Sequence, residues 1–488
     1  MKKNKLIFIV LGLALIVFSL FSDALGFGKD TNTLGAAQIA GIELGSLLVL
    51  LGIGISTIKS AVKSNEQNYI RNLSSQILDL PVLFWLVITF FFLFILFFVV
   101  PVFFANTNIQ YFTKYIPDAW APHIGFDIRA TVEHINAWLT EGISPYADGV
   151  VPYTPFALAF FIPFIILGYP SYYKILTLIT IIGYALSTFL LPISILRKKE
   201  YGVLIFLGLT GLFSYGFQFE LERGQFNVIA FLFSLLAIYI YHYKHKYRFF
   251  SYLLFSIAVQ LKLYPIIFIL MLVRNWRDWQ GNIKRFIGLG FANFTLLFIM
   301  GYQLFGDFIE QISNRTTMQS SRYEDLSISG FTYYLSEEAH LISTQYAGLI
   351  EKIFLFLLSG VILAIIIHLY RRDEKGFNPF LFFTLSIGAL MIPAASFDYK
   401  LTIFVVPMSI ILSNISAPKD NKDKVVFIFF IIIIASAYWS TFYPYEVNEV
   451  KPLFLSRNST AILAIFFSVI PLYILQKGKY HNIASVQE

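Results

Sequence analysis

AGLIEKIFLFLLSGVILAIIIHL, residues 347–369, is an apolar run that is followed at once by YRRDEK, residues 370–375. A helix of ~20 mostly apolar residues crosses the bilayer core, which is about 30 Å thick. The run therefore predicts a membrane-spanning helix, and the basic residues after it predict a cytoplasmic end. Similar apolar runs occupy much of the chain, at 6–22, 34–57, 82–104, 154–168, 172–195, 202–218, 225–242, 249–273, 286–305, 379–414, 425–443 and 460–475.

The composition agrees with this pattern. Of the 488 residues, 57% are hydrophobic and 13% are charged, and the mean hydropathy is +0.70. These values exclude an ordinary soluble globular protein of this size. The sequence contains no cysteine, which excludes disulfides, thiolate nucleophiles and Cys-ligated metals. We predict an all-α, polytopic transmembrane protein with about 11–14 membrane helices.

The distribution of charge predicts which loops are cytoplasmic. With the N-terminus in the cytoplasm, the segments on its side are 1–5, 58–80, 196–201, 243–249, 274–285, 370–378, 415–424 and 476–488. Together they contain 24 of the 36 Lys and Arg residues but 9 of the 29 Asp and Glu residues. This bias matches the positive-inside rule and puts both termini in the cytoplasm of a multi-pass protein in the cell membrane. It also accounts for the net charge of +7 without a nucleic-acid partner.

This topology requires 249–273 and 379–414 to be broken hairpins and 154–168 to be re-entrant. Polar and helix-breaking residues interrupt the first two runs, namely Gln260, Lys262 and Pro265 in one, and Pro393, Asp398, Tyr399 and Lys400 in the other. Such residues are tolerated at membrane depth where they are buried in protein or line a wet cavity. The breaks therefore indicate a site.

A short amphipathic helix is expected in the external loop 105–152. Apolar residues recur there at helical spacing, at Ile128, Val132, Ile135 and Leu139. Asp127 stands where an N-cap is expected, and Gly142 and Pro145 end the run. With a single apolar stripe, this helix is expected to lie along the membrane surface.

The predicted topology brings Asp127, the stretch 220–225, Lys262 and the turn 398–400 to the same non-cytoplasmic interface. A carboxylate there can act as a base toward a sugar hydroxyl. Arg and Lys can hold a phosphate and stabilise the charge that grows on it as it leaves. The sequence has neither G-x-x-x-x-G-K-[ST] nor G-x-G-x-x-G, so a soluble nucleotide-binding domain is not indicated.

The chain resembles the GT-C glycosyltransferases and, within them, glycosyltransferase family 87. The resemblance covers roughly 80–410 and leaves residues 1–75 outside. It depends on GFDIRATVEHINAWLTEGISPYADGVVPYTPFALAFFIPF at 125–164, ERGQFNVIAFLFSLLAIY at 222–239, QLKLYPIIFIL at 260–270, SFDYKLTIFVVP at 396–407 and, more weakly, SISGF at 327–331. It implies a catalytic membrane module at 79–415, flanked by two additional helices in 1–78 and further helices in 416–488.

The resemblance also implies an activity and roles for residues. The activity is inverting transfer of a hexose, typically mannose, from a polyprenyl-phosphate donor to a lipid-linked or glycan acceptor on the non-cytoplasmic face, without a metal cofactor. Asp127 would be the general base. Donor phosphate binding falls to Lys262, Arg223 and Gln225, and substrate positioning to Asp398, Lys400, His123 and Tyr153.

A structural role stays open for each of these side chains. Asp127 and Gln225 fit helix caps, Lys262 fits snorkelling or an ion pair with Asp398, and Asp398 also fits a pair with Lys400. Glu220 and Glu222 resemble a metal-binding acidic pair, but no nearby His completes a ligand set.

Two other classes of membrane protein compete with the transferase. A transporter or lipid flippase also has broken helices and intramembrane charges, but such proteins usually show two related halves, which this sequence lacks. A polysaccharide polymerase or ligase is expected to centre on an external loop rich in Arg and His instead of a GFD-type loop.

Overall fold

A computed structural model describes residues 125–169, 171–195, 207–208, 211, 215–317, 325–338, 340–393 and 396–414, together with residues 11, 14 and 15. In these ranges the chain is helical, and its β-type pairing consists of two isolated bridges, Asn275 with Lys375 and Asp325 with Phe397. The predicted all-α class is confirmed. The helices predicted in 1–78 and 416–488 lie outside the described residues, apart from positions 11, 14 and 15, so the proposed domain boundaries stay predictions.

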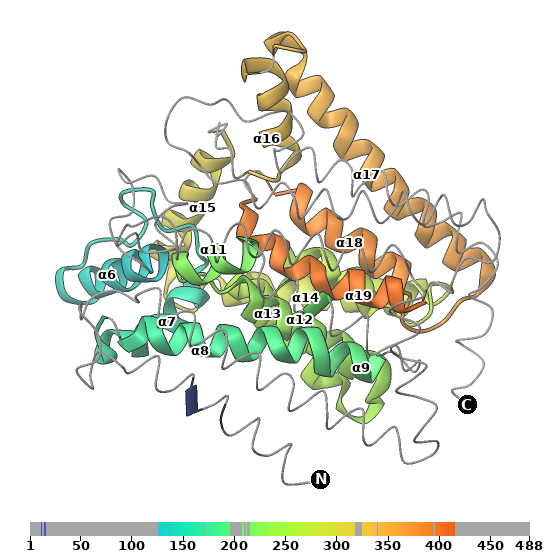
Figure 1. Cartoon of the computed structure of the whole chain (residues 1–488), viewed down its shortest axis with the longest axis horizontal. Helices are drawn as coiled ribbons and strands as arrows, with labels where there is room; N and C mark the ends of the chain where they lie inside the picture. Colours follow the sequence, from blue (N-terminus) through green and yellow to red (C-terminus); the bar gives the residue numbers. More distant parts are fainter. Residues whose placement is uncertain are drawn as a thin grey trace.

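Among the described helices in Figure 1, α6 lies at the left end of the molecule, α8 runs lengthwise toward α9, and α17 runs obliquely down the upper right side. In chain order they are α6 Phe126–Glu141, α7 Pro155–Leu167, α8 Ser171–Ala185, the π-helix η3 Leu186–Leu190, α9 Leu191–Ile195, α11 Tyr215–Arg223, α12 Asn227–Tyr243, the 3-10 helix η4 His245–Tyr247, α13 Arg248–Leu261, the 3-10 helix η5 Tyr264–Leu272, α14 Trp279–Leu296, α15 Tyr302–Thr317, α16 Ile328–Tyr333, the π-helix η6 Tyr334–Glu338, α17 Thr344–Arg372, α18 Pro379–Met391, the 3-10 helix η7 Asp398–Phe404 and α19 Val405–Asn414.

The run 249–273 is broken where the sequence predicts. Helix α13 ends at Leu261, Lys262 has extended backbone angles, and η5 returns along α12 with a proline in its first turn. Contacts at both ends fix the return path: the Tyr264 hydroxyl donates to the Asn227 carbonyl at 2.9 Å, and His242 Nε2 lies 2.7 Å from the Met271 carbonyl oxygen. The run 379–414 is likewise interrupted between α18 and η7, and α19 packs back on α18.

Helix α6 differs from its prediction at its N-terminus and in one residue of its apolar stripe. Its N-cap is Gly125, in the left-handed region with φ 78°, so Asp127 lies in the first turn and the predicted N-cap role of Asp127 is wrong. Ile128, Val132 and Ile135 are buried as expected, but Leu139 is 51% exposed. Gly142 ends the helix in the left-handed conformation, which confirms the predicted stop.

Helix α12 connects the two main clusters of buried apolar side chains. Its N-cap Phe226 and residues of its first turn, including Ile229, pack with α6, α7 and α8. From Phe231 onward, including Ile238, its buried residues pack with η5, α18 and α19. The Phe231 ring lies 5.9 Å from that of Phe268 and 6.3 Å from that of Phe382. Both ends of α12 are thereby held in the core.

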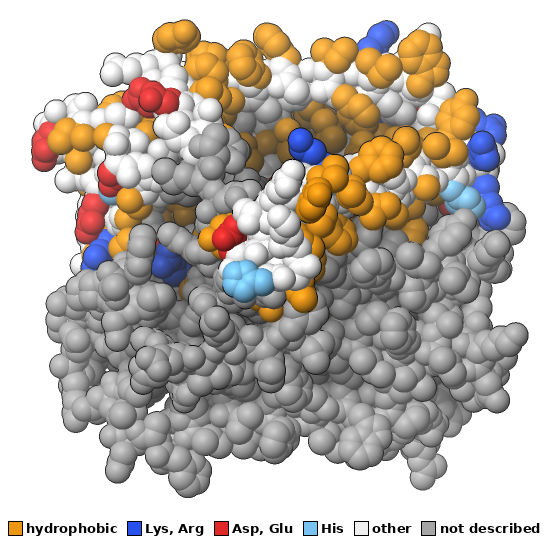
Figure 2. Space-filling model, turned by 90° about the horizontal axis from the view of Figure 1, so that it is seen from above, with side chains coloured by type: hydrophobic (Ala, Val, Ile, Leu, Met, Phe, Trp, Pro, Cys, Tyr) orange, Lys and Arg blue, Asp and Glu red, His pale blue; other side chains and the backbone are white. Residues whose placement is uncertain are grey.

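Among the described helices, α17 is long and apolar enough to cross a membrane, and α7, α12, α18 and the stretch 399–411 are shorter apolar helices. Apolar side chains occupy much of the described surface in Figure 2, and Lys and Arg side chains gather at its right edge. The number of spans and the side on which each loop lies stay predictions.

Candidate active site

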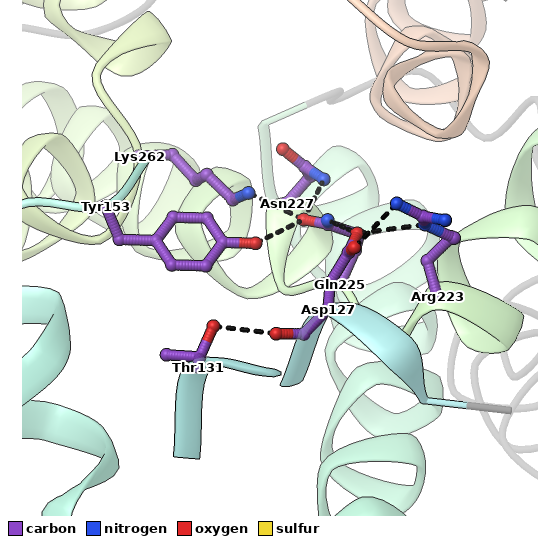
Figure 3. A network of polar contacts seen from close by, with 7 residues as sticks. All are labelled: Asp127, Thr131, Tyr153, Arg223, Gln225, Asn227 and Lys262. Carbon is purple, nitrogen blue, oxygen red and sulfur yellow. Dashed lines mark hydrogen bonds and ion pairs between the residues drawn. The ribbon is translucent and has the colours of Figure 1, made fainter. Parts of the chain in front are cut away.

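Asp127 is the centre of a polar network at the start of α6 (Figure 3). The Arg223 guanidinium donates to both carboxylate oxygens, from Nη2 at 2.7 Å and from Nε at 3.1 Å. The Gln225 side-chain amide donates to the same carboxylate. The side chains of Asp127 and Arg223 are 13% and 18% exposed, so this charge-assisted pair is largely shielded from solvent.

Lys262 joins the network through the other end of Gln225. Its Nζ donates to Gln225 Oε1 at 2.6 Å and lies 4.4 Å from the ring centroids of both Tyr153 and Phe226. The two aromatic faces favour a cation at this place. The Tyr153 hydroxyl is 3.4 Å from Gln225 Oε1, and burial raises the pKa of Tyr153, so its proton is retained. Gln225 is therefore a bridge between the carboxylate and the lysine.

A tight turn between α11 and α12 brings Arg223 and Gln225 to Asp127. Gly224 in this turn has φ 65°, and a Cβ at this position would lie 2.6 Å from Ile128 Cγ2. The Tyr173 hydroxyl holds the same turn by donating to the Leu221 carbonyl at 2.9 Å. Because glycine alone fits the close approach without strain, the turn can pack directly against the start of α6.

Glu220 supports the network from within the protein, where it is fully buried. Its carboxylate accepts hydrogen bonds from Asn227 Nδ2 at 2.9 Å and from the Val228 backbone N–H at 3.1 Å. Burial raises the pKa of Glu220 to about 7, opposed by Asn227 and by the charge of Lys262. In the described part of the chain, no group of three His, Cys, Asp or Glu side chains comes together as a metal ligand set, and the side chain of Glu222 lies outside the described residues.

The turn at 398–400 approaches the site from η7. Lys400 is buried, with its Nζ 5.8 Å from the Tyr264 ring centroid, and the carboxylates that act on its charge are those of Asp325 and Glu220. Asp325 accepts from the backbone N–H groups of Ser327 at 2.9 Å and Ser396 at 2.8 Å, and burial raises its pKa. Asp325 thus connects the loop before α16 to the chain before η7.

The structure brings five of the eight predicted site residues into one network: Asp127, Tyr153, Arg223, Gln225 and Lys262. Lys400 lies near the Tyr264 ring and within electrostatic reach of Glu220. His123 and the side chain of Asp398 lie outside the described residues. Lys262 donates to Gln225, and the alternative of an ion pair with Asp398 falls on a side chain outside the described residues.

The sequence interpretation missed the contributions of Asn227 and Asp325. Asn227 is hidden at the start of an apolar run, and Asp325 stands in a polar loop where an acid is unremarkable. One signal for Asp325 was present: it precedes the N-cap Ser327 of α16, whose hydroxyl accepts from Gly330 N at 2.9 Å. In a chain this apolar, an acidic side chain beside the start of a helix is expected to be buried and therefore to need hydrogen-bond donors.

Taken together, the site offers one carboxylate and two cations in a shielded position. The carboxylate can accept a proton from an incoming hydroxyl. Arg223 and Lys262 have the charge and the donors to bind a phosphate. The arrangement suits group transfer with a phosphate leaving group.

Comparison with known proteins gives one match. The family model described as glycosyltransferase family 87 matches residues 152–396, about half of the chain. The match includes Tyr153, Arg223, Gln225 and Lys262 but begins after Asp127. No curated protein and no solved structure matches the chain.

Proposed function

Because the chain belongs to glycosyltransferase family 87 and is thus a membrane glycosyltransferase, we propose that it moves a hexose, mannose in the first instance, from a polyprenyl-phosphate donor to a lipid-linked or glycan acceptor. The transfer takes place on the non-cytoplasmic face and inverts the anomeric carbon. The observation that carries the proposal is the chain of contacts from Arg223 through Asp127 and Gln225 to Lys262. It brings a carboxylate and two cationic side chains side by side, which supports their assignment as base and phosphate-binding groups.

In the proposed reaction, Asp127 removes the proton from an acceptor hydroxyl as that oxygen attacks the anomeric carbon. A new C–O bond forms on the face opposite the phosphate while the bond from the anomeric carbon to the phosphate oxygen breaks. The electron pair leaves with the phosphate, and Lys262 and Arg223 stabilise its growing negative charge. The products are the glycosylated acceptor and the polyprenyl phosphate, with the proton on Asp127. Side chains offset the charge, so the proposal includes no metal cofactor.

The ion pair between Asp127 and Arg223 implies that the donor binds before the acceptor hydroxyl is deprotonated. With both carboxylate oxygens held by Arg223, the base faces its partner instead of an acceptor. An arriving phosphodiester competes for the same guanidinium fork, because phosphate and carboxylate have matching geometry. Donor binding then releases Asp127 for the acceptor hydroxyl. The base becomes available once a leaving group is in place, which protects the donor from loss to water.

The test is sugar transfer by the purified protein in liposomes that contain polyprenyl-phosphate mannose and a mixture of glycolipid acceptors. Asp127→Asn is expected to lower the rate by roughly 100- to 10,000-fold, the usual contribution of a general base. Asp148→Asn is the matched control, since Asp148 lies in the same loop region but pairs with His134 at 2.6 Å, away from the network. Full activity in Asp127→Asn would remove Asp127 from the mechanism. Transfer from a nucleotide sugar alone would overturn the donor class.

A further inference from the structure

A second cluster of charge lies at the Tyr243 end of α12, opposite the Asn227 end that carries the active site. The Tyr241 ring is flanked by two guanidinium groups, that of Arg248 at 5.3 Å and that of Arg285 at 5.2 Å from its centroid. Arg274 lies close by: burial lowers the pKa of His245, and the charges of Arg248 and Arg274 lower it further. We call Arg248, Arg274 and Arg285 the arginine cluster.

The arginine cluster has no acidic partner among the described residues. Arg285 donates to the Leu272 carbonyl at 3.0 Å and to the Tyr252 hydroxyl at 3.1 Å, both of which are neutral. Arg248 Nη2 contacts His245 Nδ1 at 2.8 Å. The nearby carboxylate of Asp373 pairs with Arg277 and Lys375 instead, at 3.7 and 3.9 Å. Within the described ranges, these three guanidinium groups therefore lie near one another without a compensating carboxylate.

Exposed apolar side chains flank the arginine cluster on both helices that carry it. On α13, Phe249 is 75% and Phe250 is 53% exposed, next to Arg248. On α14, Ile283 and Ile287, two residues before and two residues after Arg285 in the sequence, are exposed. Helices α13 and α14 pack together, so these exposed apolar side chains belong to the same pair of helices as Arg248 and Arg285. Aromatic residues beside basic ones are typical of the headgroup level of a bilayer.

We propose that the arginine cluster binds the phosphate headgroup of an anionic phospholipid in the leaflet opposite the active site, with the acyl chains lying along the exposed apolar residues of α13 and α14. Guanidinium groups bind phosphate oxygens through paired hydrogen bonds, and basic surfaces of this kind attract anionic lipids. The sequence agrees, because Arg248, Arg274 and Arg285 belong to two segments predicted to be cytoplasmic, 243–249 and 274–285. This proposal does not depend on the identity of the sugar donor.

The bound lipid has a consequence for the active site. Helix α12 extends from the cluster to Asn227, and α13 extends from Arg248 to Lys262. A headgroup that joins Arg248 to Arg285 fixes the far ends of the helices that carry the site residues. Anionic lipid is therefore expected to stabilise the folded protein and the geometry of the network.

The test uses the full-length protein in nanodiscs of phosphatidylcholine alone or with phosphatidylglycerol, and measures the number of lipids bound by native mass spectrometry and the thermal unfolding midpoint. The wild-type protein is expected to retain phosphatidylglycerol and to unfold several degrees higher in its presence. The double variant Arg248→Gln/Arg285→Gln is expected to lose both effects. The control Lys246→Gln/Lys284→Gln removes the same charge from exposed neighbours and is expected to keep them.

Three results would overturn the proposal. One is equal stability of the wild-type protein in both lipid mixtures. Another is an equal loss in both double variants, which would mean that the arginines act as general surface charge. The third is a full stabilising effect from inorganic phosphate in phosphatidylcholine nanodiscs, which would make this a site for free phosphate. If Arg248→Gln/Arg285→Gln does not fold, Arg285→Lys, which keeps the charge but loses the planar fork, is expected to weaken phosphatidylglycerol binding about tenfold.

Discussion

At the Asn227 end of α12 the carboxylate of Asp127 is joined to Arg223 and, through Gln225, to Lys262, whereas at the Tyr243 end the arginine cluster has no carboxylate among the described residues. The first group of charges is nearly balanced, so a ligand must exchange partners to enter. The second has neutral partners in the described part of the chain, so an anion does not have to displace a described carboxylate to bind there. One helix thus separates a selective site from a permissive one.

The distance between the two ends of α12 agrees with the proposal that they face opposite leaflets of the membrane. Helix α12 has 17 residues, which corresponds to about 25 Å at 1.5 Å per residue. A bilayer core is about 30 Å thick. The antiparallel partner α13 covers a similar span in the opposite direction, from Arg248 to Leu261. The network and the arginine cluster are therefore far enough apart to face opposite leaflets.

Cysteine labelling offers the largest expected effect, because its outcome is all or none. The natural chain has no cysteine, so a single Cys is the only reactive thiol. Glu133→Cys on α6 and Lys246→Cys in η4 both replace exposed residues, one at each end. In intact cells a membrane-impermeant maleimide is expected to modify Glu133→Cys and to spare Lys246→Cys. Both should react after the membrane is permeabilised, and labelling of both in intact cells would place the two ends on one face.

Arg223→Gln tests whether the paired charges of the active site contribute to donor binding and catalysis. The change removes the fork that holds Asp127 and the proposed phosphate partner, and it is expected to lower kcat/KM for the donor roughly 100-fold. Arg223→Lys keeps the charge without the paired hydrogen bonds and should recover part of that loss. Arg129→Gln is the control, since Arg129 lies on α6, the helix of Asp127, and pairs with Glu133 at 3.3 Å. Equal losses in Arg223→Gln and Arg129→Gln would assign Arg223 a general structural role.

The sequence was most informative where polar residues interrupt apolar runs. Lys262 and the turn 398–400 mark true breaks in the structure, because an apolar helix can accept such residues only where other polar groups meet them. The same reasoning predicts that Asp127, Gln225 and Lys262 lie at one interface. The roles of these residues and the multi-pass topology remain predictions.

Other features depend on contacts between distant segments and could not be predicted from local patterns. Asp127 resembles an N-cap in the sequence, but Gly125 takes that position because it packs against Tyr173, where a Cβ would lie 2.7 Å from a ring atom. Glu220 resembles half of a metal-binding pair with Glu222, yet the turn at Gly224 directs it to the Val228 N–H. In both cases tertiary packing overrides a motif of a few residues.

The charge state of Glu220 is expected to have the smallest effect on activity. It allows the active site to be compared with and without an excess positive charge. Burial raises the pKa of its carboxyl to about 7 from an ordinary 4.5, so the group is neutral in acid and charged in base. The charges that act with it are those of Asp127, Arg223, Lys262, Lys400 and Asp325. With Glu220 neutral, Asp127, Arg223 and Lys262 together have one excess positive charge, which suits a phosphodiester. With Glu220 charged, that excess disappears.

The apparent KM for the donor is therefore expected to rise about three- to tenfold as the pH increases through 7, which corresponds to ~0.7–1.4 kcal/mol of lost attraction. Glu220→Gln should abolish this dependence, while Glu133→Gln, on the exposed face of α6, should keep it. The folding equilibrium gives an independent check. Because the pKa is raised in the folded state, the wild-type protein binds a proton on folding between pH 4.5 and about 7 and loses stability as the pH rises through that window. Glu220→Gln should remove this contribution, and an unchanged pH profile of both KM and unfolding in this variant would show that the buried carboxyl does not set the charge of the active site.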